Sequence, residues 1–240
     1  MSTKYEPDVD VSVVIPVYNS EDCVGSLVEE LKAAFAVSGT GHEIILINDC
    51  SPDRSWGRIT EAAEEHPAVV GINLRRNFGQ DNAIMAGLGC ARGHVVIIMD
   101  DDLQHDPRDM EKLIKQIEAG YDVCYANFHA KHQAWWKNLG SWFNGKVAEI
   151  VIGKPPDVYL SPYKAIARGV VREIVKYDGP FPYVDGLIFR VTRSITQIDA
   201  EHHDRYAGQS NYNLRRSIAV WLKLATGFSV LPLRIAAYMG

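Results

Sequence analysis

The amino-terminal half alternates continuous apolar runs with amphipathic stretches, and this alternation constrains the fold more than any other feature. Residues 11–17 (VSVVIPV) form the first run, whose branched side chains are typical of a strand covered on both faces. Short links between runs and helical stretches imply right-handed crossovers and a parallel sheet. We therefore expect a three-layer α/β domain, with further strands at 43–47, 69–74, 95–99 and 121–128. One helix is expected after residue 22, a second ends at about residue 66, and two more cover 80–91 and 107–119.

The pattern changes after about residue 130. An aromatic-rich helical stripe comes first, and strands are expected at 163–167 and 192–199. A polar loop at 201–213 then precedes an amphipathic helix at 214–224. No internal repeat or separable linker is visible. We predict one catalytic domain over residues 1–212, followed by an amphipathic, membrane-proximal segment at 213–240.

Composition excludes several classes of protein. Hydrophobic residues make up 47% and charged residues 23% of the 240, as in ordinary globular proteins, and the net charge of −5 disfavours non-specific nucleic-acid binding. The four cysteines are too far apart for a CxxC pair or a disulfide framework. The first ten residues are polar, unlike a signal peptide, and the apolar stretch 217–233 is too short and too interrupted to span a bilayer. We expect a cytoplasmic protein that is soluble or rests on a membrane surface.

Polar residues collect just beyond the predicted strands. Open parallel sheets bind ligands beyond the carboxyl ends of their strands, so these residues mark the expected site. Neither a GxGxxG segment nor a P-loop follows the first strand, which weakens a dehydrogenase or an ATPase reading. The segments in question are 16–19, 48–49, 75–80 and 100–105.

The triplet Asp100, Asp101 and Asp102 is the sharpest local feature. Adjacent carboxylates repel one another unless a cation sits among them, and oxygen ligands suit Mg²⁺ or Mn²⁺. Such an ion beside a diphosphate neutralises charge on a leaving group. The alternative is that the triplet only caps the helix expected to start near Pro107.

Several segments, in this order and spacing, resemble the family 2 inverting glycosyltransferases with a GT-A fold. The segments are VSVVIPVYNSED, INDCSPD, NLRRNFGQDNAIMAGL and MDDDLQHDP. The likeness is greatest to the branch that transfers sugars onto polyprenyl phosphates, which includes dolichol-phosphate-mannose synthase. HHDRYAGQSNYNLRRS and FSVLPLRIAAYMG extend it to the last residue. The resemblance implies a Rossmann-like, mostly parallel sheet flanked by helices, with a C-terminal amphipathic helical region.

The resemblance also implies roles for individual residues. The donor's base and ribose would contact Pro16, Tyr18, Ile47 and Asp49. The metal that bridges the diphosphate would be Mg²⁺ or Mn²⁺, and its ligands would be Asp100, Asp102 and Gln104. Asp101 and Arg76 would line the donor site, and two residues of a closing loop would contact the diphosphate, namely Arg205 and Ser210.

Two departures from the family pattern bear on catalysis. Many relatives carry a carboxylate in a G-D-F-R-L segment, where this chain reads Ser161-Pro162-Tyr163-Lys164-Ala165. Many also carry an arginine before a Gly-Leu pair, where this chain has Asp185. Asp185 is therefore a candidate base, or else a structural carboxylate bonded to local backbone amides. A phosphate acceptor is already ionised and needs orientation more than deprotonation, whereas a sugar hydroxyl needs a base.

The expected activity is transfer of a sugar from a nucleotide-diphosphate sugar, expected to be UDP-linked, to a polyprenyl phosphate at the cytoplasmic face of the membrane. The alternatives are a transferase that extends a glycan on a sugar hydroxyl and a metal-dependent nucleotidyltransferase. Two amphipathic stretches could lie on the membrane or pack inward, and a homo-oligomer is compatible with the sequence. These stretches are the helix at 214–224 and the stripe that contains Trp135, Trp136, Trp142 and Phe143.

Overall fold

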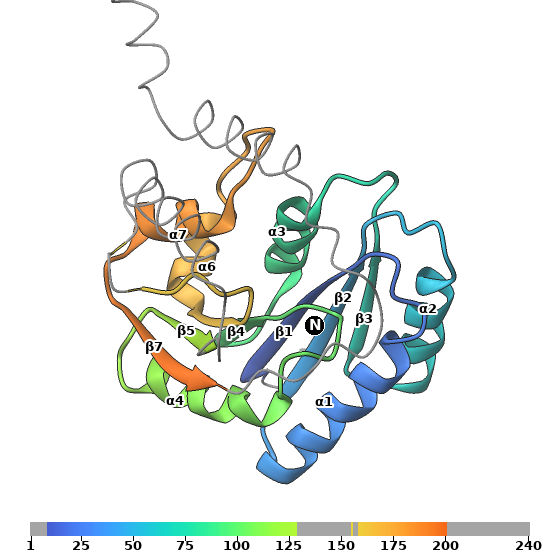
Figure 1. The fold of residues 1–240 in the computed structure, drawn as a ribbon, viewed down its shortest axis with the longest axis horizontal. Helices are drawn as coiled ribbons and strands as arrows, with labels where there is room; N and C mark the ends of the chain where they lie inside the picture. Colours follow the sequence, from blue (N-terminus) through green and yellow to red (C-terminus); the bar gives the residue numbers. More distant parts are fainter. Residues whose placement is uncertain (1–8, 129–154, 156–157, 201–240) are drawn as a thin grey trace, which may run out of the picture.

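The computed structural model describes residues 9–128, 155 and 158–200. A seven-stranded sheet in the order β3-β2-β1-β4-β6-β5-β7 forms its centre (Figure 1). Four of the first five strands follow the predicted runs to within a residue at each end, and β5 begins two residues later than predicted. The strands are β1 (Val11–Val17), β2 (His42–Asn48), β3 (Val69–Asn73), β4 (Val95–Ile98), β5 (Val123–Phe128), β6 (Lys164–Ala167) and β7 (Ile195–Ala200).

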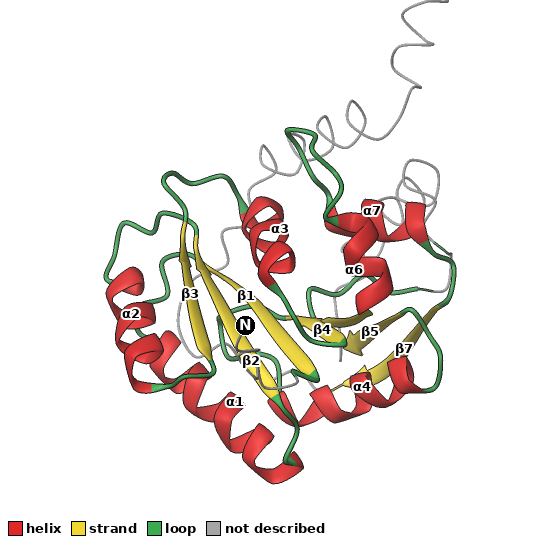
Figure 2. Cartoon of the chain, turned by 180° about the vertical axis from the view of Figure 1, so that it is seen from behind, coloured by secondary structure: helices red, strands yellow, loops and turns green. Residues whose placement is uncertain are grey.

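Helices cover both faces of this sheet, as expected for a three-layer α/β fold (Figures 1 and 2). Apolar residues of α1, α2 and α4 pack on one face, and those of α3, α6 and α7 pack on the other. The strands β1 and β4 are buried along their length, and so is β2 after His42. The helices are α1 (Val24–Ser38), α2 (Ser55–Glu65), α3 (Gln80–Cys90), α4 (Met110–Glu118), which follows the 3-10 turn η1 (Pro107–Asp109), α6 (Arg168–Ile174) and α7 (Val184–Val191).

One strand departs from the parallel arrangement. The pairs that β1 forms with β2 and with β4, that β2 forms with β3, and that β5 forms with β7 are parallel. β6 lies antiparallel between β4 and β5, so these two strands do not pair with each other. Lys164 is the register partner of both Ile98 and Tyr125. The insertion therefore brings the segment before β6 to the carboxyl end of β4.

The start of α1 lacks a local cap. The helix expected after residue 22 begins at Val24 and has no side-chain cap and no acid in its first turn. The backbone amides of Ser20 and Glu21 are instead bonded to the side chains of Ser55 and Asp53, 3.0 Å away in each case. These residues therefore connect two loops at the carboxyl edge of the sheet.

Several expectations concern residues outside the described ranges. These are the aromatic stripe, the polar loop with Arg205 and Ser210, and the amphipathic segment at 213–240. Within the described ranges, none of the helices combines the length and the apolar character needed to span a bilayer. All four cysteines are free thiols.

Candidate active site

A cleft of about 910 Å³ opens at the carboxyl edge of β1, β2 and β4. Six of the residues expected in the donor site line it: Pro16, Tyr18, Asp49, Asp100, Asp101 and Asp102. Chain reversal at the same sheet edge after three parallel strands brings these distant segments together. The structure therefore has a cleft lined largely by polar residues at the predicted position of the site.

Three other expected residues are not among those that line the cleft. The side chain of Ile47 is fully buried in the core beneath α3 and does not line the cleft. The guanidinium of Arg76 lies 4.4 Å from the ring centre of Phe78, on the exposed loop before α3. The amide of Gln104 donates to Asp102 Oδ1 over 3.2 Å, within the loop that follows β4.

The acidic triplet connects three parts of the site. Asp100 Oδ1 accepts a 2.8 Å hydrogen bond from Gln80 Nε2, at the start of α3. Asp101 Oδ2 accepts a 3.2 Å bond from the amide of Tyr18, just beyond β1. The helical capping role falls to Asp106, whose side chain accepts from the amide of Arg108. The reading in which the triplet only caps this helix is therefore wrong.

Burial and mutual repulsion perturb these carboxylates. Burial, together with the negative charges of Asp102 and Asp101, raises the pKa of Asp100 from 3.8 to about 7. Burial likewise raises the pKa of Asp101. A cation would stabilise the ionised form of these carboxylates by offsetting their mutual repulsion. Their oxygen atoms are ligands of the kind that Mg²⁺ and Mn²⁺ prefer. In the described part of the chain, no three His, Cys, Asp or Glu residues form a ready-made metal cluster.

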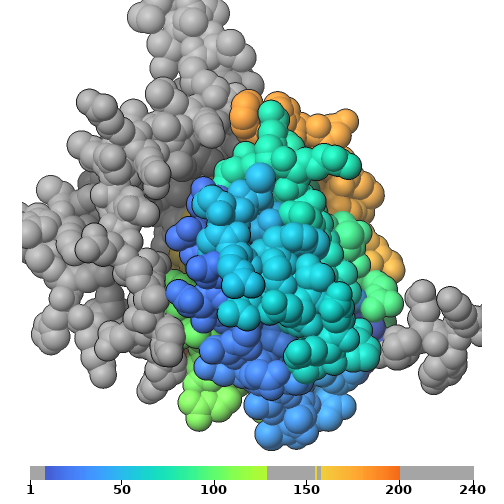
Figure 3. All heavy atoms as spheres, turned by 90° about the vertical axis from the view of Figure 1, so that its right-hand side faces the viewer, coloured from blue at the N-terminus to red at the C-terminus, as the bar shows by residue number. Residues whose placement is uncertain are grey.

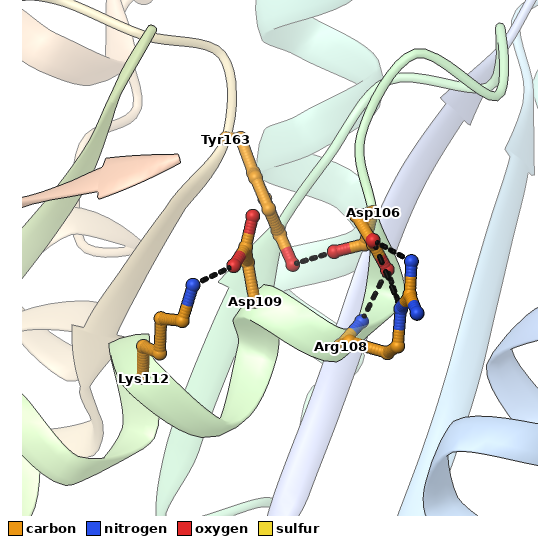
Figure 4. Close-up of polar contacts among 5 residues, drawn as sticks. All are labelled: Asp106, Arg108, Asp109, Lys112 and Tyr163. Carbon is orange, nitrogen blue, oxygen red and sulfur yellow. Dashed lines mark hydrogen bonds and ion pairs between the residues drawn. The ribbon is translucent and has the colours of Figure 1, made fainter. Parts of the chain in front are cut away.

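The loop after the triplet is held at its far end. The ring of His105 stacks between those of Phe128 and Tyr163, with centroids 5.4 and 4.9 Å away. The amide of Asp100 donates to His105 Nδ1 over 3.3 Å, and the hydroxyl of Tyr163 donates to the carbonyl of Asp106 over 3.1 Å (Figure 4). Figure 4 also shows that Arg108 and Lys112 pair with the carboxylates of Asp106 and Asp109. Leu103, within this loop, has a left-handed backbone conformation with a φ of 60°.

Asp49 has a structural role that its sequence motif does not reveal. The amides of Phe78 and Gly79 donate to its two carboxylate oxygens over 2.7 and 2.8 Å. Asp49 is buried, and it follows β2 directly. It therefore fixes the loop between β3 and α3 against the floor of the cleft.

A buried cation lies behind the acidic triplet. The ammonium of Lys164 pairs with Asp185 Oδ1 and lies 5.0 Å from the centre of the Tyr125 ring. The Tyr125 hydroxyl donates to the same oxygen of Asp185 over 2.8 Å. The positive charge of Lys164 also acts on Asp100 and Asp81. It offsets part of the rise in pKa that burial causes in each, and both pKa values remain raised.

Asp185 thus lies in the first turn of α7, bonded to two side chains of the neighbouring strands. Asp81, in the first turn of α3, accepts a 3.1 Å bond from the amide of Val184 and so joins the starts of α3 and α7. Negative side chains at helix starts interact favourably with the helix dipole. One lysine therefore lies among carboxylates from α3, from α7 and from the loop after β4.

Sequence reasoning missed Lys164 and Tyr125, and it placed Gln80 only within the segment 75–80. A lysine within an otherwise apolar strand was a visible signal, because such a side chain is buried only with a partner. The sequence placed Gln80 at the edge of the sheet, but its bond to Asp100 depends on how α3 packs beside the loop after β4. The bonds from the amides of Ser20 and Glu21 to the side chains of Ser55 and Asp53 were equally hidden, because each joins residues more than 30 positions apart.

Comparisons with known proteins agree with this geometry. The sequence profile of Glycosyl transferase family 2 matches residues 12–174. The chain is 30% identical over 239 residues to an undecaprenyl-phosphate 4-deoxy-4-formamido-L-arabinose transferase of Enterobacter sp. (strain 638), covering 99% of the chain and 73% of the relative. The protein of the same name from Serratia proteamaculans (strain 568) is 32% identical with the same coverage.

Among solved structures, the fold is similar to that of glucosyl-3-phosphoglycerate synthase from Mycobacterium tuberculosis. The TM-score is 0.63 at 16% identity, over 92% of the chain and 80% of the solved chain. Another crystal structure of that synthase, with Mn²⁺, UDP and glucosyl-3-phosphoglycerate bound, also has a TM-score of 0.63, at 15% identity over 90% and 77% of the two chains. The expected GT-A fold is confirmed. The chain is a glycosyltransferase and belongs to glycosyl transferase family 2.

Proposed function

We propose that this protein transfers a sugar from a nucleotide-diphosphate sugar to a polyprenyl phosphate at the cytoplasmic membrane face. The donor that we propose is a UDP-sugar. The observation that carries the proposal is the acidic triplet, which lines the cleft at the carboxyl edge of the sheet. The relatives named above, which act on undecaprenyl phosphate according to their names, support the acceptor class. The Mn²⁺ and UDP bound by a fold neighbour support the donor class.

The donor would lie across the ends of β1, β2 and β4. The half-exposed ring of Tyr18 and the loop held by Asp49 would contact the base and the ribose. The residues that would hold a divalent cation are Asp100, Asp102 and Gln104, and their oxygen atoms fit Mg²⁺ or Mn²⁺. When bound, such a cation neutralises the charge that develops on the departing diphosphate. Arg205 and Ser210 would contact the diphosphate, as the family resemblance implies.

The acceptor would need positioning rather than activation. A phosphate monoester is already ionised at neutral pH, so its oxygen can attack the anomeric carbon directly. The new bond to this oxygen forms on the face opposite to the departing diphosphate, and the configuration at the sugar carbon inverts. Asp185, bonded to Lys164 and Tyr125, would orient the neighbouring elements, or serve as the base if the acceptor were a hydroxyl.

The experiment that tests this function combines the purified chain with radiolabelled UDP-sugars, Mn²⁺, and either a short-chain prenyl phosphate or an oligosaccharide. We expect label in the prenyl phosphate product, with inverted anomeric configuration by NMR. Product from the oligosaccharide alone would reject the lipid acceptor. Release of pyrophosphate from a nucleoside triphosphate, with no sugar transfer, would reject the transferase in favour of a nucleotidyltransferase.

A further inference from the structure

Two exposed loops lie side by side next to the cleft. The first (residues 74–79) leads into α3, and the second (residues 175–183) leads into α7. The bond from the amide of Val184 to Asp81 joins the starts of the two helices. Figures 1 and 2 show both loops projecting at the same end of the molecule, beyond the start of α3. In Figure 3 the teal region around the start of α3 and the orange region of α6 and α7 meet at the upper end of the coloured surface.

Each loop exposes an aromatic side chain. Phe78 is 43% exposed and Phe181 is 56% exposed, and each lies three residues before one of the two bonded residues, Asp81 and Val184. The backbone of each residue is hydrogen-bonded to a side chain. The buried carboxylate of Asp49 accepts from the amide of Phe78, and the hydroxyl of Tyr177 donates to the carbonyl of Phe181 over 3.4 Å.

The charge of the two loops opposes that of the whole chain. Three cationic side chains, Arg75, Arg76 and Lys176, accompany a single carboxylate, Asp178. Lys176 is paired with Glu173 of α6, whereas both arginines are exposed. The chain as a whole carries a net charge of −5. The guanidinium of Arg76 stacks on the Phe78 ring, so a cation and an aromatic face are presented together.

We infer that the loops 74–79 and 175–183 form a docking surface for an anionic lipid bilayer. The occupant follows from the chemistry of the surface. Aromatic rings beside exposed arginines suit the boundary between acyl chains and anionic headgroups. Asn77 and Gly79 of the first loop also line the cleft, so docking would place the cleft mouth at the headgroup level. The inference rests on the proposed function, because a lipid-borne acceptor gives such a surface its use.

Binding of the full-length chain to vesicles tests the surface directly. Co-sedimentation is measured with vesicles of phosphatidylcholine alone and with vesicles that also contain phosphatidylglycerol. Phe181→Ala and Arg75→Gln should each weaken binding to the anionic vesicles roughly fivefold, from one half-exposed ring or one guanidinium near the surface. Phe181→Trp should keep the binding, because tryptophan favours the same boundary.

Tyr121 supplies a matched control. It is 41% exposed, but it precedes β5 and so lies at the opposite, amino-terminal edge of the sheet. Tyr121→Ala should bind vesicles as the wild type does. Equal binding of Phe181→Ala, Arg75→Gln and the wild type would overturn the inference, as would an equal loss in Tyr121→Ala. Thermal unfolding of each variant establishes that it is folded.

Sugar transfer separates this inference from the proposed function. With a water-soluble short-chain prenyl phosphate, Phe181→Ala should turn over like the wild type. With a long-chain prenyl phosphate in anionic vesicles, its rate should fall about as far as its binding does. No transfer to either acceptor by the wild type would reject the proposed function and leave the vesicle result standing. Equal rates of variant and wild type on the vesicle-borne acceptor would reject the docking surface alone.

Discussion

Replacing Asp100 with asparagine should stabilise the protein while removing its response to metal. The carboxyl of Asp100 is half-buried beside two further carboxylates, and its pKa is raised from 3.8 to about 7. At about 1.36 kcal/mol for each tenfold change in proton affinity, the ionised form costs about 4 kcal/mol at most. Relaxation and water in the cleft reduce this, and we expect a gain of about 2 kcal/mol at pH 8. The amide oxygen of asparagine can still accept from Gln80 Nε2.

The sign of the pH dependence follows from the raised pKa. The folded protein holds this proton more tightly than the unfolded chain, so the wild type loses stability as pH rises from about 4 to about 7. Asp100→Asn lacks that loss. Its melting temperature, measured in EDTA, should match the wild type near pH 4 and exceed it by roughly 4–8 °C at pH 8. Addition of Mn²⁺ and UDP at pH 8 should raise the melting temperature of the wild type only.

Asp53→Asn is the matched control. Burial opposes ionisation of Asp53, but bonds from the Ser55 side chain and from the amides of Ser55 and Glu21 outweigh it, so its pKa is lowered. This contribution is present above about pH 4 and is lost as pH falls. Asp53→Asn should therefore destabilise the protein at pH 8. A melting temperature of Asp100→Asn at or below that of the wild type at pH 8, without metal, would refute the electrostatic reasoning.

Three more substitutions probe the frame of the site. Lys164→Met should cost about 3–5 kcal/mol in urea unfolding because it leaves Asp185 without its cation, and adding Asp185→Asn should recover part of that loss; additive losses would contradict the pairing. Asp49→Ala should weaken UDP binding by calorimetry about tenfold, since two loop amides lose their acceptor; unchanged affinity would contradict a fixed loop. Gly87→Ala should cost about 1–3 kcal/mol, because a Cβ there would lie 2.5 Å from a methyl of Val14; an unchanged urea midpoint would show that α3 can move.

Local periodicity predicted most of the elements, because each buried strand and amphipathic helix carries its own pattern. Strand order is a different kind of information. The pattern of 163–167 predicts a strand, but the antiparallel position of β6 between β4 and β5 depends on long-range pairing. The position of Lys164 behind Asp100 is a consequence of that pairing. A local pattern could therefore not reveal it.

The candidate site divides in the same way. Asp100, Asp101 and Asp102 follow a predictable strand, so their place in the cleft could be predicted. Ile47 matched a family segment, but its own alternation along β2 turns the side chain into the core. The role of Asp49 as an acceptor for two amides depends on a loop about 30 residues away. Motifs indicate which residues gather, whereas tertiary contacts decide which atoms remain available.

The position of β6 fixes which side of the sheet each of two successive side chains faces. Tyr163 belongs to the core under α1 and α4, and Lys164 belongs to the opposite side with α7. A shift of one residue would exchange them, placing an ammonium in the aromatic stack of His105 and a phenol against Asp185. A single residue inserted within the strand would therefore disturb the acidic loop and α7 together.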